Sequence, residues 1–303
     1  MSMQLSCVIL NYNDAETTEK LVKQLADYDV LHQIIVVDNA STDDSLERLR
    51  KLESDANASQ SGKVRVISAD HNGGYGSGNN LGVRYAAEQG GATHVLIANP
   101  DVVFSEQSLK AMLAVFARHP EVGIVTTRIR DARFPDLKNG WPLRSFTREL
   151  FSMGPVSRRL LGKTFDYPDS YFTGRSAVYV GAVHGSMLMV DTEKFLEAGG
   201  YDEGLFLYEE EQVLGRRMQN AGYRSVLLLN QHYDHEHSTS ISKSFSDAMK
   251  RQRLREESTL YYMKYYLHIS PVKEQIAKMW FAGIRLEMQV AKLVGIKILR
   301  RNH

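Results

Sequence analysis

Short apolar runs alternate with longer stretches of helical periodicity through the first 126 residues. Apolar runs of this length predict strands, and the periodic stretches predict helices. The predicted strands cover residues 5–10, 33–37, 64–68, 93–98 and 122–126, and the predicted helices cover residues 15–28, 44–52, 79–89 and 105–118. This rhythm is typical of the α/β class, with a mostly parallel, Rossmann-like nucleotide-binding sheet and right-handed crossovers.

The pattern is less regular after residue 126. Proline and glycine interrupt residues 127–177, which we interpret as an insertion with helical pieces. Residues 178–190 again have strand-like composition, residues 209–220 predict a helix, and residues 225–229 predict another strand. In the first half, the polar residues 54–62 predict a surface connection.

We expect one sheet-containing domain followed by a helical extension. The domain covers residues 1–245, with halves at 1–126 and 127–245, and the extension covers residues 246–303. From residue 271 onward, seven lysines and arginines stand against two glutamates, interleaved with apolar and aromatic residues. Such a helix can lie on an anionic membrane surface. The alternative is a helical hairpin that packs on the preceding domain or on a second subunit.

Composition narrows the class of protein. The 303 residues are 43% hydrophobic and carry a formal net charge of +1, which gives no overall attraction to nucleic acid. Cys7 is the single cysteine, which excludes an intrachain disulfide and a cysteine-based zinc site. No apolar run approaches the roughly 18 to 20 residues of a membrane span, and the N-terminus does not resemble a signal peptide. We therefore expect a cytoplasmic protein.

Polar residues follow each of the first three predicted strands. Asn11 and Asn13 follow the first, Asp38 follows the second, and Asn72 follows the third. The carboxyl ends of parallel strands open on one edge of a sheet, where α/β proteins bind their ligands. Asp38 is therefore expected to accept hydrogen bonds from a nucleobase or a ribose.

A glycine-rich segment extends the third polar cluster. Gly73 and Gly74 allow positive φ and close approach of the backbone, and a helix beginning near Asn79 would offer free N–H groups to an anion or a sugar hydroxyl. The segment lacks the G-x-G-x-x-G dinucleotide fingerprint, since the sixth residue from Gly74 is Asn79. The chain also lacks a Walker sequence, so we expect phosphate binding to depend on a metal ion and basic groups.

Asn99 and Asp101 follow the predicted strand at residues 93–98. Asp101 is thereby placed at the carboxyl end of a buried strand, where a carboxylate can hold a divalent cation that bridges nucleotide phosphates. Asn-Pro-Asp is also good turn chemistry, and for this segment alone a simple turn is an open alternative.

Two further clusters carry ionisable groups. Glu209, Glu210 and Glu211 begin the predicted helix, where acidic residues are favourable by about 0.3 to 1 kcal/mol even without a further role. His235 and His237 belong to a run of metal-capable residues at 232–237, for which solvated histidines are the alternative interpretation.

Five motifs in this order resemble family 2 glycosyltransferases of the GT-A fold. They are VILNYN at 8–13, VVDNASTD at 36–43, NGGYG at 72–76, NPD at 99–101 and YEEE at 208–211. The resemblance extends from about residue 5 to residue 240 and is strongest to the rhamnosyltransferase-like branch that builds bacterial surface polysaccharides. Residues 127–245 would then form the acceptor-side half.

The resemblance implies a donor site and a metal site. Asp101 matches the last aspartate of the family's Asp-x-Asp motif, with Asn99 in place of the first, and His235 or His237 matches a late histidine near the diphosphate. The implied cofactor is Mg²⁺ or Mn²⁺, and the metal ligands are Asp101, His235 and His237. The implied donor-binding residues are Asn11, Asn13, Asp38, Asn72, Gly73, Gly74, Asn79, Asn99 and Asp101.

The resemblance also implies a general base. The family has a Glu-Asp pair at this place, and the chain has Glu210-Glu211, so Glu211 occupies the base position and Glu210 is the alternative. An acceptor hydroxyl would attack the anomeric carbon opposite the departing diphosphate, which inverts the configuration.

The implied reaction moves rhamnose or another hexose from a UDP- or dTDP-sugar to a glycan or a lipid-linked saccharide. The C-terminal helices would then contact the inner face of the plasma membrane or a second subunit of a homo-oligomer. A sugar nucleotidyltransferase is the enzymatic alternative, although its Gly-rich, Lys/Arg-bearing signature after the first strand is absent. A non-catalytic protein that binds sugar nucleotides or polysaccharide is the third hypothesis.

Overall fold

A computed structural model describes residues 3–59, 62–130, 138–235 and 248–293 of the chain. His237 and the predicted domain boundary at residue 245 lie outside these ranges. Among the helices in the described ranges, none combines the length and the apolar content required to cross a bilayer.

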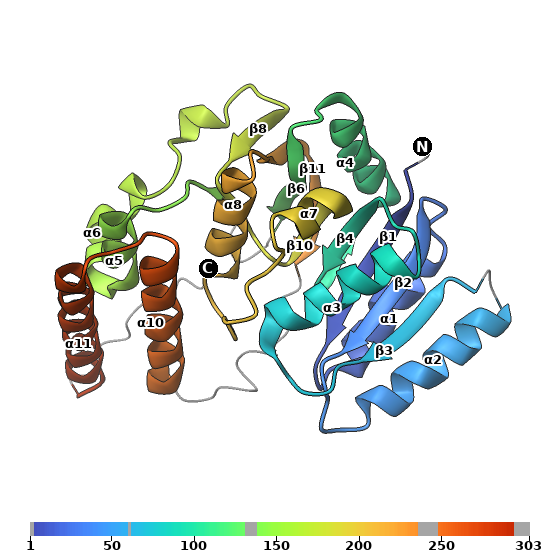
Figure 1. The fold of residues 1–303 in the computed structure, drawn as a ribbon, viewed down its shortest axis with the longest axis horizontal. Helices are drawn as coiled ribbons and strands as arrows, with labels where there is room; N and C mark the ends of the chain where they lie inside the picture. Colours follow the sequence, from blue (N-terminus) through green and yellow to red (C-terminus); the bar gives the residue numbers. More distant parts are fainter. Residues whose placement is uncertain (1–2, 60–61, 131–137, 236–247, 294–303) are drawn as a thin grey trace.

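Four parallel strands form the first half of the main sheet, in the order β3-β2-β1-β4 (Figure 1). They are β1 (Leu5–Asn11), β2 (Leu31–Asp38), β3 (Val64–Ser68) and β4 (His94–Ala98). Helices α1 (Ala15–Ala26), α2 (Ser45–Ser59) and α3 (Gly74–Glu88) connect them. Nearly all residues of β1, β2 and β4 are buried, as their continuous apolar sequence predicts. The parallel, Rossmann-like arrangement expected for this half is confirmed.

The second half of the sheet is mixed. β10 (Met187–Asp191) runs antiparallel between β4 and β6 (Val122–Arg130), and β11 (Arg224–His235) runs parallel to β6. β5 (Val102–Phe104) and β8 (Ala177–Val180) pair antiparallel with β11, and β7 (Gly140–Trp141) and β9 (Ala182–Val183) form a small separate sheet. The strand-like composition at residues 178–190 therefore corresponds to three strands, β8, β9 and β10.

Helices cover both faces of the main sheet. Alternating residues of β1 point to opposite faces: Cys7 and Ile9 join a core with α1, α2 and α4 (Glu106–Arg118), whereas Val8 joins a core with α3, α7 (Thr192–Glu197) and α8 (Glu210–Asn220). This layered arrangement leaves the carboxyl ends of β1, β2 and β4 at one edge, where their polar residues follow.

The C-terminal helices pack beside the sheet domain. α10 (Ala248–Tyr265) and α11 (Pro271–Leu293) share an apolar cluster with α5 (Phe146–Met153), next to α6 (Pro155–Leu161) (Figure 1). Short 3₁₀ helices at Gly162–Thr164 and Asp169–Tyr171 complete the segment at residues 127–177. The predicted helical pieces and helical extension are thus present.

Three predicted boundaries are wrong. α3 begins at Gly74 and not near Asn79, α2 continues to Ser59 through the residues expected to form a surface connection, and the late His-rich segment is in β11 as far as His235. The first error has a packing cause. A Cβ at Gly78 would lie 2.3 Å from Leu10, so α3 lies too close to β1 for a larger residue.

Gly74 brings the start of this helix into close contact with another segment. Its φ is +88°, and a Cβ there would lie 2.2 Å from the carbonyl oxygen of Phe206. The adjacent Tyr75 N–H donates to the same oxygen at 3.2 Å. The glycine therefore joins the start of α3 to the loop that leads into α8.

We predict that Gly74→Ala destabilises the protein far more than Gly222→Ala. Gly222 has nearly the same φ, +87°, but a Cβ there meets none of the described residues within 4 Å. Gly222→Ala should cost only the left-handed backbone term, about 1 to 2 kcal/mol. Gly74→Ala adds an overpacking cost of about 1 to 3 kcal/mol. Urea unfolding of both variants measures the difference, and equal losses would contradict the contact with Phe206.

Candidate active site

Asn11 and Asp38 join the ends of β1 and β2. Asn11 is fully buried and donates from Nδ2 to Asp38 Oδ1 at 2.9 Å, while its Oδ1 accepts from Thr18 Oγ1 at 2.8 Å. Asp38 is 1% exposed and accepts from the Ser41 N–H at 3.0 Å and the Ser41 hydroxyl at 2.6 Å. The two side chains therefore hold the loop after β2 in place.

Asn13 lies at the exposed rim of the same edge. Its side chain exchanges hydrogen bonds with Thr42, whose N–H donates to Asn13 Oδ1 at 2.8 Å and whose hydroxyl accepts from Asn13 Nδ2 at 3.1 Å. Asn13 has a positive φ of 53°, which an asparagine tolerates better than most residues. Of the predicted donor-binding residues at or just after the ends of β1 and β2, Asn13 is the one that is exposed to solvent.

Asn72 connects the residues of the third polar cluster through hydrogen bonds. Its Oδ1 accepts from the Gly74 N–H at 3.1 Å and from Asn39 Nδ2 at 2.9 Å. Gly73 packs on Ser77, and Asn79 is buried inside α3 with its amide donating to the Tyr75 carbonyl at 2.9 Å. Asn79 therefore does not present a helix N-terminus.

Asn39 is a polar residue of this edge that the sequence analysis missed. It is 3% exposed, and in the described part of the chain its Oδ1 is buried without a hydrogen-bond partner. Its position directly after Asp38 was the available signal.

Asp101 and His235 meet at the end of the sheet. Asp101 lies in the turn between β4 and β5, and His235 ends β11, which pairs with β5. The Asp101 Oδ1 and His235 Nε2 atoms are 3.3 Å apart, and both side chains are at least nine-tenths buried. Asn99 is fixed beside them, because its N–H donates to the Ser186 carbonyl at 2.8 Å.

His184 is a second histidine near this pair. Its ring lies 5.7 Å from the His235 ring, centroid to centroid, and its Nδ1 is hydrogen-bonded to the Ser186 hydroxyl at 2.9 Å. Sequence reasoning did not single out His184, since one histidine within strand-like residues gives no spacing signal.

Asp101 and His235 suit a divalent cation that a substrate also coordinates. Among residues 3–59, 62–130, 138–235 and 248–293, no group of three or more His, Cys, Asp or Glu side chains is arranged to hold a metal ion. Mg²⁺ in nucleotide sites is typically held by one or two protein carboxylates, with phosphate oxygens and water completing its shell. A carboxylate beside an imidazole fits that kind of site, and Mn²⁺ accepts both donor types.

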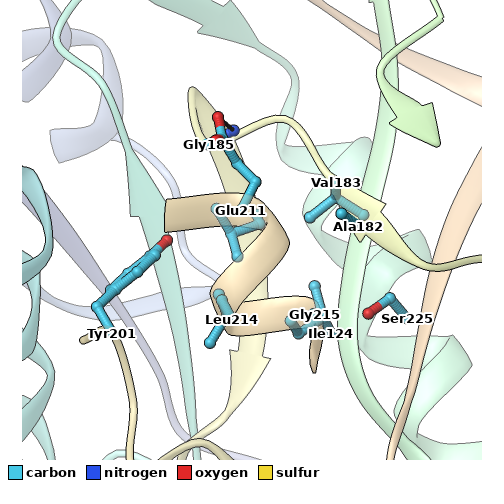
Figure 2. A pocket seen from close by; sticks show the side chains of 10 residues that line it. Ile124, Ala182, Val183, Gly185, Tyr201, Glu211, Leu214, Gly215 and Ser225 are labelled. Atoms are coloured by element: carbon cyan, nitrogen blue, oxygen red, sulfur yellow. Dashed lines mark hydrogen bonds between the residues drawn. The ribbon is translucent and has the colours of Figure 1, made fainter. Parts of the chain in front are cut away.

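Glu211 faces the loop between β9 and β10. Its Oε1 accepts from the Gly185 N–H at 3.3 Å, as Figure 2 shows, and Gly185 adjoins His184 in sequence. A small cavity of about 10 Å³ lies beside it, lined largely by apolar residues such as Ile124 and Leu214. Burial among these residues raises the pKa of Glu211 above its ordinary value of 4.5.

Glu209 and Glu210 lie in equally unfavourable surroundings for charge. Burial raises the pKa of each to about 8, helped by repulsion from Glu149 for Glu209 and from Glu211 for Glu210. The Glu210 Oε1 is buried without a hydrogen-bond partner in the described residues. Perturbed carboxyl groups of this kind cluster at functional sites.

The backbone before α8 is strained. Tyr208 and Glu209 both have positive φ, 74° and 69°, and such residues cost on the order of 1 to 3 kcal/mol each. The turn that they form sets the direction in which Glu210 and Glu211 enter the helix.

Helix α10 holds this turn in place. The Ser258 hydroxyl donates to the Leu207 carbonyl at 2.7 Å, and the Thr259 hydroxyl donates to Glu209 Oε1 at 2.9 Å. The Arg255 guanidinium lies 4.9 Å from the centre of the Tyr208 ring. The C-terminal extension is therefore part of the candidate site, which sequence reasoning did not anticipate.

Two solved structures with this fold contain a nucleotide or a nucleotide sugar together with Mn²⁺. The structure aligns with a GalNAc-T7 crystal structure containing UDP, GalNAc and Mn²⁺, with a TM-score of 0.57, 14% identity and coverage of 88% of this chain and 57% of that one. It aligns with mannosyltransferase PcManGT from Pyrobaculum calidifontis, in complex with GDP-Man and Mn²⁺, with a TM-score of 0.55, 14% identity and coverage of 99% and 82%. At this identity the likeness establishes the GT-A fold alone.

Curated relatives match in sequence. N-acetylglucosaminyl-diphospho-decaprenol L-rhamnosyltransferase of Mycobacterium tuberculosis is 29% identical over 205 residues, which cover 64% of this chain and 62% of the relative. The low-salt glycan biosynthesis hexosyltransferase Agl10 of Haloferax volcanii is 26% identical over 210 residues, which cover 68% and 59%. The chain thus spans about three fifths of the length of these relatives.

A family model matches more than half of the chain. The model for glycosyl transferase family 2 covers residues 6–180, which include the first four of the five motifs. With the fold and the edge site described above, the chain belongs to glycosyl transferase family 2.

Proposed function

We propose that the protein is a metal-assisted, inverting glycosyltransferase that moves a hexose from a nucleotide sugar to a saccharide acceptor. The observation that carries this proposal is the meeting of Asp101 and His235, 3.3 Å apart, at the edge of the sheet where Glu211 also contacts the loop next to His184. A cation site and a buried carboxylate on one edge are what displacement of a diphosphate by a hydroxyl requires.

The proposed donor is a UDP- or dTDP-sugar, with rhamnose as the first choice of hexose. The relative from M. tuberculosis is named a rhamnosyltransferase that acts on a diphospho-decaprenol substrate, and Agl10 is named a hexosyltransferase. By analogy we propose a lipid-linked saccharide as acceptor, presented at the inner face of the plasma membrane. The structural neighbours crystallised with UDP or GDP-Man and Mn²⁺ support a nucleoside-diphosphate donor and a divalent metal ion, which we propose to be Mn²⁺ or Mg²⁺.

Different residues of this chain would bind the donor nucleotide and activate the acceptor hydroxyl. Asn13 and the loop that Asn11, Asp38 and Asn72 organise would bind the nucleoside. Mg²⁺ or Mn²⁺ held by Asp101 and His235 would supply positive charge to the departing diphosphate. Glu211, held by the Gly185 N–H, would accept the proton of the attacking hydroxyl, a role worth about 10² to 10⁴ in rate.

Binding of donor and metal tests this assignment. We expect Mn²⁺ to raise the melting temperature further when a matching nucleoside diphosphate sugar is present, because a ligand at 100 times its Kd adds about 2.7 kcal/mol to the free energy of unfolding. Asp101→Asn should lose the Mn²⁺-dependent part of the shift. Asp234→Asn is the matched control, because Asp234 precedes His235 but pairs with Arg130 at 2.6 Å. A thermal-shift screen of UDP-, dTDP- and GDP-sugars gives the readout, and an unchanged Mn²⁺ effect in Asp101→Asn would contradict the metal site.

The pH dependence of transfer should reflect the raised pKa of Glu211. The base must be ionised to accept a proton, so kcat/KM should fall as the pH decreases through that pKa, with the acid limb above pH 4.5. Glu203→Gln is the control, since Arg84 and Asn80 lower the pKa of Glu203 and its loss should leave the profile in place. Rates that stay constant down to pH 4.5 would argue against a buried carboxylate base.

A further inference from the structure

Helix α11 has two apolar faces, and the fold uses one of them. Ala277, Phe281, Ile284 and Ala291 are buried, and the first three share a cluster with α5 and α10. Figure 1 shows α11 at the outer edge of the molecule, with α10 on its inner side. A helix with a second apolar face needs a second partner.

The second face is exposed and continuous over the length of α11. Its apolar side chains are 42% to 86% exposed, and the spacing between successive positions alternates between four and three residues. We call these positions the outer stripe: Val272, Ile276, Met279, Gly283, Leu286, Val290 and Leu293. A strict heptad seam of this kind is the pattern by which one helix packs on another helix.

Gly283 lies near the middle of the outer stripe. Glycine inside a helix costs roughly 0.5 to 1 kcal/mol relative to alanine, yet a Cβ at Gly283 would meet none of the described residues within 4 Å. Packing against the part of the chain that the structure describes therefore gives no reason for this glycine. A second helix that crosses at this position would explain the glycine, because the missing side chain lets another side chain or backbone approach closely.

The charges around the stripe favour a protein partner over an anionic membrane. Lys278 pairs with Glu274 at 2.7 Å, Arg285 pairs with Glu256, and Lys273 lies 5.5 Å from the centre of the Phe146 ring. The basic residues at 297, 300 and 301 lie outside the described residues. Two of these cations, Lys278 and Arg285, are thus already paired with carboxylates of the same chain.

We infer that the outer stripe binds the same stripe of a second copy of this chain, with the two α11 helices antiparallel. In this register Val272 faces Val290, Ile276 faces Leu286, and the long side chain of Met279 faces Gly283 of the other copy. A twofold axis makes each of these contacts twice, as an isologous dimer requires.

The flanking positions fit the antiparallel orientation. Lys273 of one copy lies opposite Glu287 of the other, so that two opposite charges meet on each side of the axis. On the other flank, Gln275 lies opposite Gln289, and Ala282 lies opposite its own copy. A parallel pair would bring like residues together along the seam, without matching Lys273 to Glu287.

The mass of the full chain in solution tests the dimer. By sedimentation or light scattering at low micromolar concentration, the wild type should have twice the mass of one chain. Leu286→Glu should have half that mass, while Leu160→Glu, which changes a leucine on α6 that is 76% exposed against 61% for Leu286, should stay dimeric. Circular dichroism should be unchanged in both variants, because both leucines are exposed in the single chain, and Leu286→Glu should lose only the thermal stability that the dimer adds. A monomeric wild type, or a dimer that survives Leu286→Glu, would overturn the inference.

Single cysteines test the orientation. The native Cys7 is fully buried, and burial raises the pKa of its thiol, so an introduced cysteine is the one that reacts. Oxidation of Ala282→Cys should give a cross-linked dimer. Val290→Cys should not, because Val290 faces Val272 of the other copy, 18 helical residues away from the second Val290, so the two introduced cysteines are about 27 Å apart. Cross-linking of Val290→Cys alone would show a parallel pair and contradict the proposed register.

A membrane is the competing occupant of the stripe. Flotation with vesicles of anionic phospholipid separates the two, because the dimer hides the stripe. If the stripe binds a second copy, the same fraction of wild type and of Leu286→Glu should float with the vesicles. If the wild type is monomeric and floats, and Leu286→Glu does not float, the inference is wrong. These measurements involve no donor, metal or acceptor, so they are independent of the proposed reaction.

Discussion

Burial of consecutive carboxyl groups at the start of α8 is the constraint on which the candidate site depends. Desolvation disfavours their charge and raises the pKa of Glu209 and Glu210 to about 8. The fold compensates with the Gly185 N–H on Glu211 and the Thr259 hydroxyl on Glu209. A carboxylate kept in such surroundings is more basic than one in water, and this is the property that a general base needs at neutral pH.

Three segments that are distant in sequence contribute to the candidate site. The end of the sheet contributes Asp101 and His235, the loop between β9 and β10 contributes Gly185, and α10 fixes the left-handed turn before Glu210 through Ser258 and Thr259. Since α10 leads directly into α11, a partner bound at the outer stripe lies one helix away from the turn. Assembly and catalysis would then share the same C-terminal hairpin.

The sequence predicted the features that local patterns control. Continuous apolar runs located β1, β2 and β4, and polar residues after them located the edge where Asp101 and Asn72 lie. It misplaced the start of α3, because glycines at 74, 76 and 78 favour a loop unless a neighbouring segment requires them, and the crowding of Gly78 on Leu10 cannot be seen in a local window. It also missed His184 and Thr259, whose positions depend on strand pairing and on helix docking across long separations. The residues carried over from the family resemblance stay predictions until they are tested.

The most direct measurement is the single-turnover transfer rate of Glu211→Gln at saturating donor, beside Glu210→Gln. If Glu211 is the base, its variant should bind donor with unchanged affinity and lose about 10² to 10⁴ in rate, while Glu210→Gln should retain much more activity. Full transfer by Glu211→Gln, or a loss confined to Glu210→Gln, would contradict the assignment of Glu211 as the base.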